Sequence, residues 1–334
     1  MKAVAFQQPL PISSADSLFD VELPEPVASG LDLLVQVEAI SVNPVDTKVR
    51  SSAAVTEGQY KVLGWDAAGT VVAVGEKVSR FKVGDKVWYA GAIDRPGTNA
   101  EKHLVDERIV AKMPSSLSFS AAAAMPLTSI TAWELLFDRL CLGRESTGAL
   151  LILGGAGGVG SMMIQLAKKL TNLTVIATAS KAESQAWVRK MGADYVIDHH
   201  QTLAPQLKEL GFAQVQHIMC LTQTDLHIKA MPDILAPQGS VGLIDDPQQL
   251  DIVPFKRKSI SFHWELMFTR SLFQTDDMVA QHELLQKVAA MVDKGALVST
   301  LNHDYGTINS ENLKRAHQQQ ESGTTVGKIV LTGF

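Results

Sequence analysis

The pattern of apolar and polar positions changes near residue 120. Before that point the apolar runs are short, as in 33–37 and 70–74, and glycines such as Gly69, Gly75 and Gly84 separate them. Short runs of apolar and β-branched residues between turn residues are typical of strands. We therefore predict a β-rich first region with little helix.

After residue 125 candidate strands and helices alternate. Strands are predicted at 150–153, 174–178, 195–197, 217–221, 240–244 and 259–264. Helices are predicted at 121–124 with Ser120 as its cap, after Gly160, at 182–191, at 203–210, and at 276–294 with Gly295 ending it. This alternation indicates an α/β fold with a doubly wound parallel sheet. The strand-like tail 328–331 should return to the first region, because that sheet is complete without it.

A glycine-rich segment joins the first of these strands to its helix. Gly155, Gly157 and Gly160 have the spacing G-x-G-x-x-G. In a dinucleotide-binding unit the first glycine allows a tight turn, the second lets the backbone approach a pyrophosphate, and the third lets helix and strand pack closely. The helix N-terminus, with Gly158 and Val159, adds free N–H groups for phosphate. A glycine-rich turn without a ligand is the alternative, and the flanking strand and helix favour the nucleotide site.

Composition narrows the class of protein. A chain of 334 residues exceeds a single core, so two domains are expected. The net charge of −5, without a basic block, argues against nucleic acid and anionic membranes as partners. No apolar run reaches transmembrane length, and the run at residues 3–6 is too short for a signal-peptide core. Cys141 and Cys220 lie in apolar segments and are expected to be reduced core thiols of a cytoplasmic protein.

Five separated motifs carry a family resemblance along the whole chain. They are Ser41–Thr47, Val62–Gly69, Val83–Val87, Leu153–Gly160 and Gly323–Lys328. With them the chain resembles the medium-chain dehydrogenase/reductase superfamily, and within it the zinc-free quinone oxidoreductase branch that includes zinc-type alcohol dehydrogenase-like proteins. The resemblance implies a GroES-like catalytic domain at 1–125, a Rossmann dinucleotide-binding domain at 126–265, and a return of 266–334 to the catalytic domain. The active site would then lie in the cleft between the domains.

The resemblance also bears on metal binding. Zinc-bearing members have a ligating Cys where this chain has Asn43, a ligating His where it has Trp65, and a third ligand near Leu127. An amide is a poor zinc ligand, and indole and isobutyl groups are none. The first domain also lacks the four cysteines of a structural zinc lobe, and lone or adjacent histidines such as His103 and the pair at 199–200 are more often surface or cofactor contacts than zinc ligands. We expect no metal, and without a Lewis acid alcohol oxidation is disfavoured.

The end of the second Rossmann strand indicates which dinucleotide binds. An acid there would bind the ribose 2′-OH of NAD, but the chain has Ser180 and Lys181. A hydroxyl and an ammonium group suit a 2′-phosphate, so the expected cofactor is NADP(H). The resemblance implies that Lys181 and His199 hold this phosphate, although His199 replaces an aromatic residue and leaves the second contact open. The alternative is that Ser180 and Lys181 merely start a helix.

The resemblance assigns the remaining cofactor contacts. They are Asn43 beside the nicotinamide, Thr131 at the carboxamide, Thr128 nearby, Leu243 through its backbone, and Lys328 from the tail. Asn43 and Asp46 are the candidate catalytic residues. Asp46 either orients Asn43 or is a turn residue after Pro44.

Apolar side chains are the candidates for the substrate site. They are Trp65, Trp133 and Phe268, and Trp65 should face the cleft because it replaces a zinc ligand. Core packing is the alternative for such aromatic residues. Arg50 and Arg270 would suit a substrate anion, but a solvated surface position is the favoured interpretation for both.

These observations give one leading hypothesis and two alternatives. The leading hypothesis is an NADPH-dependent reductase that transfers hydride to a small quinone or α,β-unsaturated carbonyl without zinc, with solvent as a possible proton source. The alternatives are an NAD(P)-dependent alcohol or sugar-aldehyde dehydrogenase, and a non-catalytic NADPH-binding protein. We also expect a homodimer, because the sixth strand, 259–264, would otherwise be an exposed apolar sheet edge.

Overall fold

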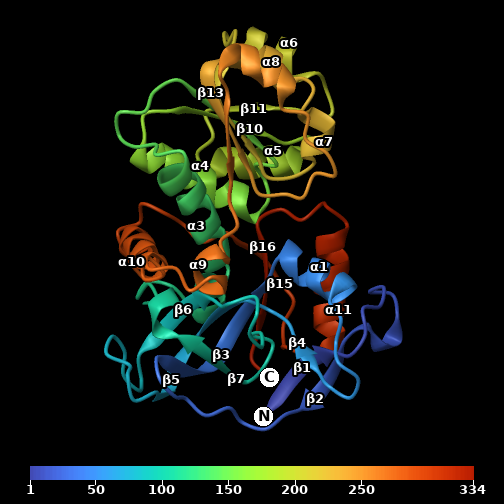
Figure 1. The fold of residues 1–334 in the computed structure, drawn as a ribbon, viewed down its shortest axis with the longest axis vertical. Coiled ribbons are helices and arrows are strands. Elements are labelled where there is room, and N and C mark those ends of the chain that lie inside the picture. The colour runs from blue at the N-terminus through green and yellow to red at the C-terminus, as the bar shows by residue number, and fades with distance from the viewer. The chain divides into compact units, whose positions relative to one another are not determined.

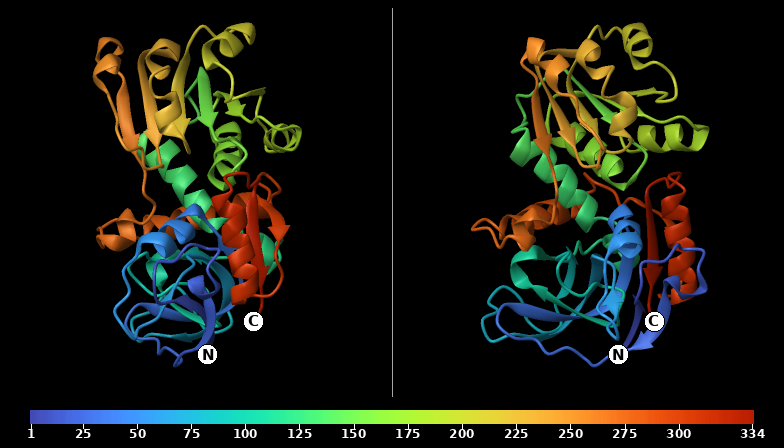
Figure 2. Two further views of the ribbon diagram at one scale, coloured as in Figure 1. Left: turned by 90° about the vertical axis from the view of Figure 1, so that its right-hand side faces the viewer. Right: turned by 45° about the vertical axis from the view of Figure 1, so that its right-hand side comes forward.

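The computed structural model describes residues 1–334, which form two compact units (Figure 1). The split unit consists of residues 1–130 and 268–334, and the inserted unit of residues 131–267. Both chain ends belong to the split unit, where Figure 2 marks them. The fold is mixed α/β, with a six-stranded parallel sheet in the inserted unit and a mainly antiparallel seven-stranded sheet in the split unit.

The split unit is built around antiparallel strands. In spatial order its main sheet contains β15 (Leu301–Asp304), β16 (Lys328–Thr332), β3 (Asp32–Val42), β5 (Asp66–Val74), β6 (Lys86–Ala90) and β8 (Val110–Lys112), with β7 (Lys102–Asp106) also paired to β3. A smaller sheet contains β2 (Phe19–Glu22), β1 (Lys2–Phe6) and β4 (Lys61–Val62). These strands confirm the predicted β-rich first region.

Strand β16 brings the two ends of the chain into one sheet. It runs antiparallel to β3, with Val330 opposite Ser41 and Ile329 opposite Val42. In Figure 1 the red strand β16 belongs to the same unit as the blue strand β3. The prediction that the tail returns to the first region is therefore confirmed. The register places Lys328, the first residue of β16, beside the chain that leaves β3 at Asn43.

The helices of the split unit differ in part from the predictions. They are α1 (Pro44–Ser52), α2 (Phe119–Ala123), α3 (Pro126–Trp133, which continues into the inserted unit), α9 (Thr269–Leu272), α10 (Ala280–Asp293) and α11 (Ser310–Glu321), with short 3-10 turns at Ala15–Ser17 and Glu107–Ile109. Ser118, not Ser120, caps α2, because the Ser118 hydroxyl accepts the N–H of Ala121 at 3.2 Å. Helix α10 begins later than predicted, since Met278 N–H turns back to the carbonyl of Thr275 at 3.0 Å.

The inserted unit has one parallel sheet. Its spatial order is β11 (Tyr195–Ile197), β10 (Thr174–Thr178), β9 (Ala149–Leu153), β12 (Val215–Cys220), β13 (Leu235–Leu243) and β14 (Ser261–Trp264). In chain order these strands read 3-2-1-4-5-6, the order of a doubly wound dinucleotide fold. The helices are α4 (Gly158–Leu170), α5 (Ala182–Lys190), α6 (Leu203–Glu209), α7 (Thr224–His227) and α8 (Met231–Ile234), with a π-helix at Glu134–Arg139 and a 3-10 helix at Val253–Lys258.

The core of the inserted unit explains why its strands read as continuous apolar runs. Leu150, Leu151 and Ile152 of β9 are all fully buried, as expected for a central parallel strand with both faces covered. Cys220 is buried in β12, but Cys141 is exposed and has a φ of 54°. The prediction of a core thiol is therefore wrong for Cys141, because the chain turns outward after the π-helix. None of the helices combines the length and apolarity that a bilayer span requires.

Candidate functional site

A buried group of polar side chains lies where β3, β5 and β16 meet. Asn43, Asp66 and Lys328 are exposed by only 1%, 0% and 3%. The Asn43 Nδ2 donates to Asp66 Oδ2 at 2.8 Å, and the Asn43 Oδ1 accepts a hydrogen bond from the Lys328 ammonium. Lys328 Nζ also donates to the Val42 carbonyl at 3.0 Å and to Asp66 Oδ2 at 3.2 Å. We call Asn43, Asp66 and Lys328 the ammonium cluster.

Asp66 is the acceptor that holds this cluster together. Its carboxylate also accepts from the Ser41 hydroxyl at 2.8 Å and from the Leu127 N–H at 2.7 Å. Burial lowers the pKa of Lys328, and the Asp66 carboxylate opposes this effect. The sequence analysis missed Asp66 and Ser41. Asp66 directly precedes the apolar residues 67–68, which are expected to be buried. Because a buried acid is rare unless it is paired, this position was a usable signal of a buried polar site.

Asp46 connects the cluster to helix α1. Pro44 is the first residue of this helix, and Asp46 in its first turn accepts the backbone N–H of Asn43 at 2.5 Å. The Asp46 Oδ1 is buried without a hydrogen bond. Burial raises the pKa of Asp46 to about 7, although the hydrogen bond from Asn43 opposes the rise. This contact reaches the backbone of Asn43 and caps the start of α1, so a role of Asp46 in orienting the Asn43 side chain stays a prediction.

The donor atoms of this cluster do not fit zinc. The Asn43 oxygen faces the Lys328 ammonium, so a divalent cation bound to it would meet a positive charge at contact distance. Trp65 has no lone pair to offer, and its Nε1–H donates to the Ala92 carbonyl at 3.0 Å. The structure has no group of three or more His, Cys, Asp or Glu side chains that could hold a metal ion.

His103, one of the remaining histidines, belongs to the core of the split unit. Its Nε2 lies 3.0 Å from the Pro96 carbonyl, which can only accept, so this nitrogen carries the hydrogen. The Nδ1 then accepts from the Tyr89 hydroxyl at 3.0 Å. Burial lowers the pKa of His103 to about 4. Both ring nitrogens are therefore used inside the unit.

The three candidate substrate residues differ in their exposure. Trp65 and Phe268 are 0% and 2% exposed, and their rings meet edge to face with centroids 5.9 Å apart. Trp133 is partly exposed and packs on Phe137 with a centroid distance of 4.8 Å. Neither Trp65 nor Phe268 presents appreciable surface in this structure, so a substrate contact stays a prediction for all three.

Arg50 and Arg270 are buried, and the expected surface position is wrong for both. Arg50 is 1% exposed and donates to the Leu10 carbonyl and to Glu321. Arg270 is 6% exposed, and its Nε donates to Asp277 at 3.0 Å. The Arg50 guanidinium is buried because distant parts of the chain supply its acceptors, whereas Arg270 pairs with an acid only seven positions away in the chain.

The glycine-rich loop of the inserted unit fits a dinucleotide. A Cβ at Gly160 would lie 2.5 Å from the Gly155 carbonyl oxygen, and a Cβ at Gly155 would lie 2.8 Å from Ala177 Cβ. At Gly157 a Cβ would meet nothing closer than 3.7 Å. Gly155 and Gly160 are thus required by packing. Gly157 borders open space, which a pyrophosphate can approach and a side chain would fill.

The start of helix α4 supplies the phosphate-binding groups. The first-turn amides of Gly158 and Val159 have no acceptor within the helix and lie at its positive end. The loop stands at the topological switch point, between the carboxyl ends of β9 and β12. There a Cβ on Gly154 would lie 2.9 Å from the Thr222 methyl group. The inserted unit therefore has the features of a dinucleotide-binding site.

The residues expected at the 2′-phosphate follow neighbouring strands. Ser180 and Lys181 come after β10 and His199 after β11, and the Ala179 N–H donates to the Ile197 carbonyl at 3.0 Å. The two strand ends therefore lie side by side, as a shared phosphate contact requires. His199 is partly buried, its Nδ1 has no hydrogen bond, and burial lowers its pKa.

Helix α5 begins without using the Lys181 side chain. Lys181 is the N-cap residue, but its backbone N–H makes the contact, donating to the Ser184 hydroxyl at 3.2 Å. Ser180 is not the cap. The Lys181 side chain is exposed. Its ammonium is therefore accessible to a phosphate, which favours that interpretation over simple helix initiation.

Three other residues expected to contact the cofactor make contacts within their own unit or are buried there. The Thr128 hydroxyl in the split unit donates to the Met125 carbonyl at 3.1 Å. Thr131 belongs to the inserted unit and is 5% exposed. Leu243 ends β13, and its carbonyl accepts the Glu265 N–H at 2.9 Å. Their contacts with a cofactor stay predictions.

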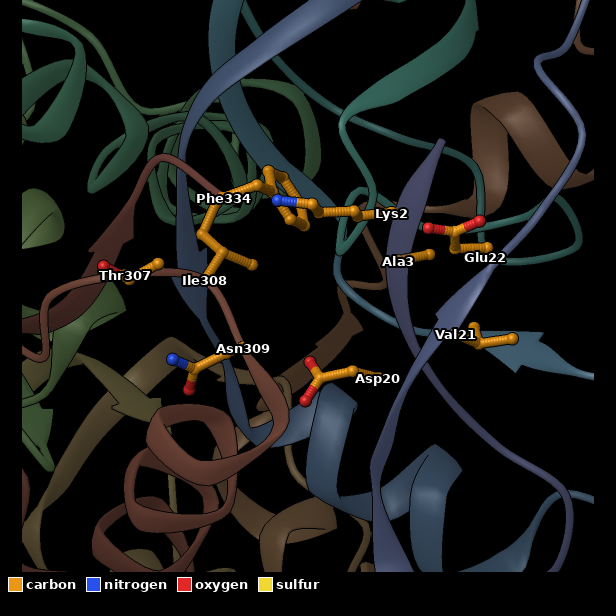
Figure 3. A pocket seen from close by; sticks show the side chains of 9 residues that line it. All are labelled: Lys2, Ala3, Asp20, Val21, Glu22, Thr307, Ile308, Asn309 and Phe334. Carbon is orange, nitrogen blue, oxygen red and sulfur yellow. The ribbon is translucent and has the colours of Figure 1, made fainter.

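A separate groove of about 370 Å³ lies on the split unit (Figure 3). It is lined by residues of β1 and β2, by the segment before α11 and by Phe334, and by none of the predicted site residues. Its Asp20 carboxylate already binds the backbone N–H and hydroxyl of Ser310, at 2.9 and 2.7 Å. This acid stabilises the start of α11, and the groove is not the candidate site.

Family models match both units. The model for the alcohol dehydrogenase GroES-like domain matches residues 29–115, and that for the zinc-binding dehydrogenase matches residues 191–331. A zinc-type alcohol dehydrogenase-like protein of Staphylococcus aureus is 40% identical over 336 residues, covering 99% of each chain. A crystal structure from Rhizobium etli, provisionally described as a zinc-dependent alcohol dehydrogenase protein, is 52% identical. It covers 100% of this chain and 98% of that chain with a TM-score of 0.96.

Other similar proteins have names that describe a reaction or a cofactor. The quinone oxidoreductase of Coxiella burnetii is 28% identical over 99% of each chain, with a TM-score of 0.81. A mycobacterial protein solved with NADPH is 27% identical over 99% of each chain, with a TM-score of 0.85. The 2-methylene-furan-3-one reductase of Solanum lycopersicum is 40% identical over 181 residues, which are 50% of this chain and 44% of that protein.

Proposed function

Because the chain belongs to the medium-chain dehydrogenase/reductase superfamily, we propose that it is an NADPH-dependent reductase of quinones or α,β-unsaturated carbonyls that works without zinc. The observation that carries this proposal is the ammonium cluster. Where zinc-bearing members have ligands, this chain has an amide whose oxygen is bound to a lysine. The similar tomato reductase and Coxiella quinone oxidoreductase support the proposed substrate class.

The inserted unit is proposed to bind the dinucleotide. The backbone at Gly157, Gly158 and Val159 would hold the pyrophosphate, and Lys181 and His199 the 2′-phosphate. The accessible Lys181 ammonium and the missing acid after β10 favour NADP(H), as does the similar mycobacterial protein bound to NADPH. A bound reduced nicotinamide would supply the hydride. Asn43 and Thr131 are proposed to position it.

The proposed substrate follows from where negative charge develops. Hydride addition to a quinone or enone gives a phenolate or enolate, whose charge is delocalised and which hydrogen-bond donors can stabilise. Alcohol oxidation must first remove a hydroxyl proton, a step that a Lewis acid promotes. Asn43 offers an N–H donor, while the cluster contains no group that fits a Lewis acid. Reduction of a conjugated carbonyl therefore suits these residues better.

A substrate panel tests the proposal. NADPH oxidation with small quinones and enones would be compared with NADP⁺ reduction by primary alcohols, secondary alcohols and sugar alcohols, in metal-free buffer. We expect turnover with quinones or enones and none with alcohols. Faster turnover of alcohols would favour the dehydrogenase alternative. Tight NADPH binding without any turnover would favour a non-catalytic NADPH-binding protein.

Metal analysis tests the zinc-free part separately. Purified protein should contain no stoichiometric zinc after dialysis, and a chelator should leave its activity unchanged. About one zinc per chain, required for activity, would overturn this part of the proposal.

We further propose that two copies associate through strand β14. This strand is hydrogen-bonded to β13 on one side and ends the sheet on the other, and its Trp264 is 54% exposed. An open strand edge with an exposed aromatic side chain suits pairing with a second copy. Light scattering at micromolar concentration should give the mass of a dimer, and a monomer mass would contradict the proposal.

A further inference from the structure

The Lys328 side chain uses all its hydrogen-bonding capacity inside the split unit. Its three ammonium hydrogens point to three oxygens, those of the Val42 carbonyl, the Asp66 carboxylate and the Asn43 amide. The residue is 3% exposed. An ammonium group has three donors and no acceptor, so none remains for another partner. Any effect of Lys328 on a substrate must therefore pass through these neighbours.

The orientation of the Asn43 amide is fixed by two opposite charges. Its oxygen faces the Lys328 ammonium, and its nitrogen faces the Asp66 carboxylate at 2.8 Å. Rotating the amide by half a turn would bring NH₂ against the ammonium and oxygen against the carboxylate. Both contacts would then be repulsive, and the low local dielectric would increase their cost.

One hydrogen of the Asn43 amide remains weakly bound. The Nδ2 has two hydrogens, and Asp66 takes one of them. The second has only the Ser41 carbonyl, at 3.5 Å. Donation from Lys328 to the amide oxygen draws electron density from the nitrogen and strengthens Nδ2–H as a donor.

We propose that Lys328 is a positioning residue: its ammonium fixes and polarises the Asn43 amide, whose weakly bound hydrogen is offered to the substrate oxygen that becomes negative during reduction. Lys328 thus acts through Asn43 instead of touching the cofactor. This inference rests on the proposed reductase function. It also explains the misfit with zinc, because the unit already contains a cation that the chain itself supplies and that a chelator cannot remove.

The amide of Asn43 can be observed directly by NMR, without turnover. In ¹⁵N-labelled protein its side-chain NH₂ signals, assigned by their loss in Asn43→Ala, should exchange slowly with solvent and be well separated. Lys328→Met should shift them together and accelerate their exchange. The matched control is Lys258→Met in the inserted unit, because Lys258 Nζ also donates to several backbone carbonyls, including those of Pro232 and Leu235 at 2.6 Å. The control should leave the Asn43 signals unchanged.

Kinetics then test the consequence for the reaction. We expect Lys328→Met to slow single-turnover hydride transfer about 10-fold, the effect of losing one hydrogen bond to the amide, with NADPH affinity within about twofold of wild type. Asn43→Ala should slow it by about 100-fold, as loss of an oxyanion donor does. In the Asn43→Ala background Lys328→Met should cost nothing further, because Lys328 acts only through the amide. Additive losses would overturn the proposal.

Chemical rescue tests whether an ammonium group is sufficient when it is no longer attached to the Lys328 side chain. Lys328→Ala leaves a space bordered by the oxygens of Val42, Asn43 and Asp66. Methylammonium or ethylammonium should restore both the hydride-transfer rate and the Asn43 signals, while tetramethylammonium, which has no N–H, should restore neither. If these variants do not fold, the double variant Lys328→Met/Asp66→Asn avoids the unpaired carboxylate. In it the Asn43 amide should still lose its fixed orientation.

The outcomes distinguish this inference from the proposed function. A folded Lys328→Met protein with unchanged Asn43 signals would overturn the positioning role. Wild-type protein that reduces no quinone or enone would overturn the reductase proposal, and the NMR comparison would still decide whether Lys328 orients Asn43.

Discussion

The ammonium cluster and the glycine-rich loop serve one proposed reaction but are built in different ways. The cluster joins side chains from residues 43, 66 and 328, which lie far apart in the sequence and are almost fully buried. The loop is a single continuous segment whose working groups are backbone amides, with the exposed Lys181 nearby. The cluster should therefore respond to mutation mainly through stability and orientation, and the loop mainly through binding.

The largest effect is expected at Asp66. Asp66→Ala leaves the Lys328 ammonium buried without its counter-charge, and breaking a buried ion pair typically costs about 3–5 kcal/mol. Urea unfolding should show a loss of this order. The control is Glu25→Ala, which removes an exposed salt bridge to Lys102 and should leave the free energy of unfolding nearly unchanged. Equal effects of the two variants would mean that the cluster is no more important to stability than a surface pair.

The next effect concerns the pH dependence of stability. The pKa of Asp46 is raised to about 7 in the folded protein, from 3.8 as the ordinary value. Between these pH values the folded protein holds a proton that the unfolded chain has lost, so the free energy of unfolding falls as pH rises. The slope from this group is about 1.4 kcal/mol per pH unit. Stability from this group is thus complete below about pH 4 and lost as pH rises through about 7.

Asp46→Asn tests this slope, because an amide oxygen can still accept the Asn43 N–H but has no proton to lose. Urea unfolding at several pH values between 4 and 8 should show the variant gaining stability relative to wild type as pH rises. Parallel curves for the two proteins would contradict the assigned protonation.

Two glycines of the loop should separate packing from binding. Gly160→Ala places a Cβ 2.5 Å from a carbonyl oxygen and should cost about 1–3 kcal/mol of stability through overpacking. Gly157→Ala meets nothing closer than 3.7 Å, so its melting temperature should stay near wild type while NADPH affinity falls. Thermal unfolding and NADPH titration measure both quantities. Unchanged NADPH affinity in Gly157→Ala would argue against pyrophosphate at this position.

The smallest effect is expected at Lys181. A partly solvated ammonium–phosphate contact should change affinity roughly tenfold, so Lys181→Ala should weaken NADPH binding and leave NADH binding nearly unchanged. Lys190→Ala, at the other end of the same helix, is the matched control. Equal losses for both dinucleotides would assign Lys181 a role in folding instead of phosphate recognition.

The sequence alone determined the parts of the molecule that depend on local chemistry. The predicted strands at 174–178 and 195–197 and the glycine spacing at 155, 157 and 160 all follow from neighbouring residues, while Asn43 became a candidate only through the family resemblance. Hydrophobic periodicity and turn chemistry are local properties, so they remain readable in a single chain. The exact helix limits were less accessible, because Ser118 and Ser120 are both suitable cap residues in the sequence, and the structure shows that the Ser118 hydroxyl accepts the first-turn N–H.

Only the tertiary structure decided which polar side chains share a buried site. Asp66 and Lys328 are 262 positions apart, and their pairing depends on the register of β16 against β3 and of β3 against β5. Arg50 and Glu321 likewise come into contact only when the two ends of the chain pack into one unit. A charged residue looks the same in the sequence whether it is solvated or paired. The partner that compensates the cost of burying the charge comes from a distant part of the chain, and local sequence patterns do not indicate which residue it is.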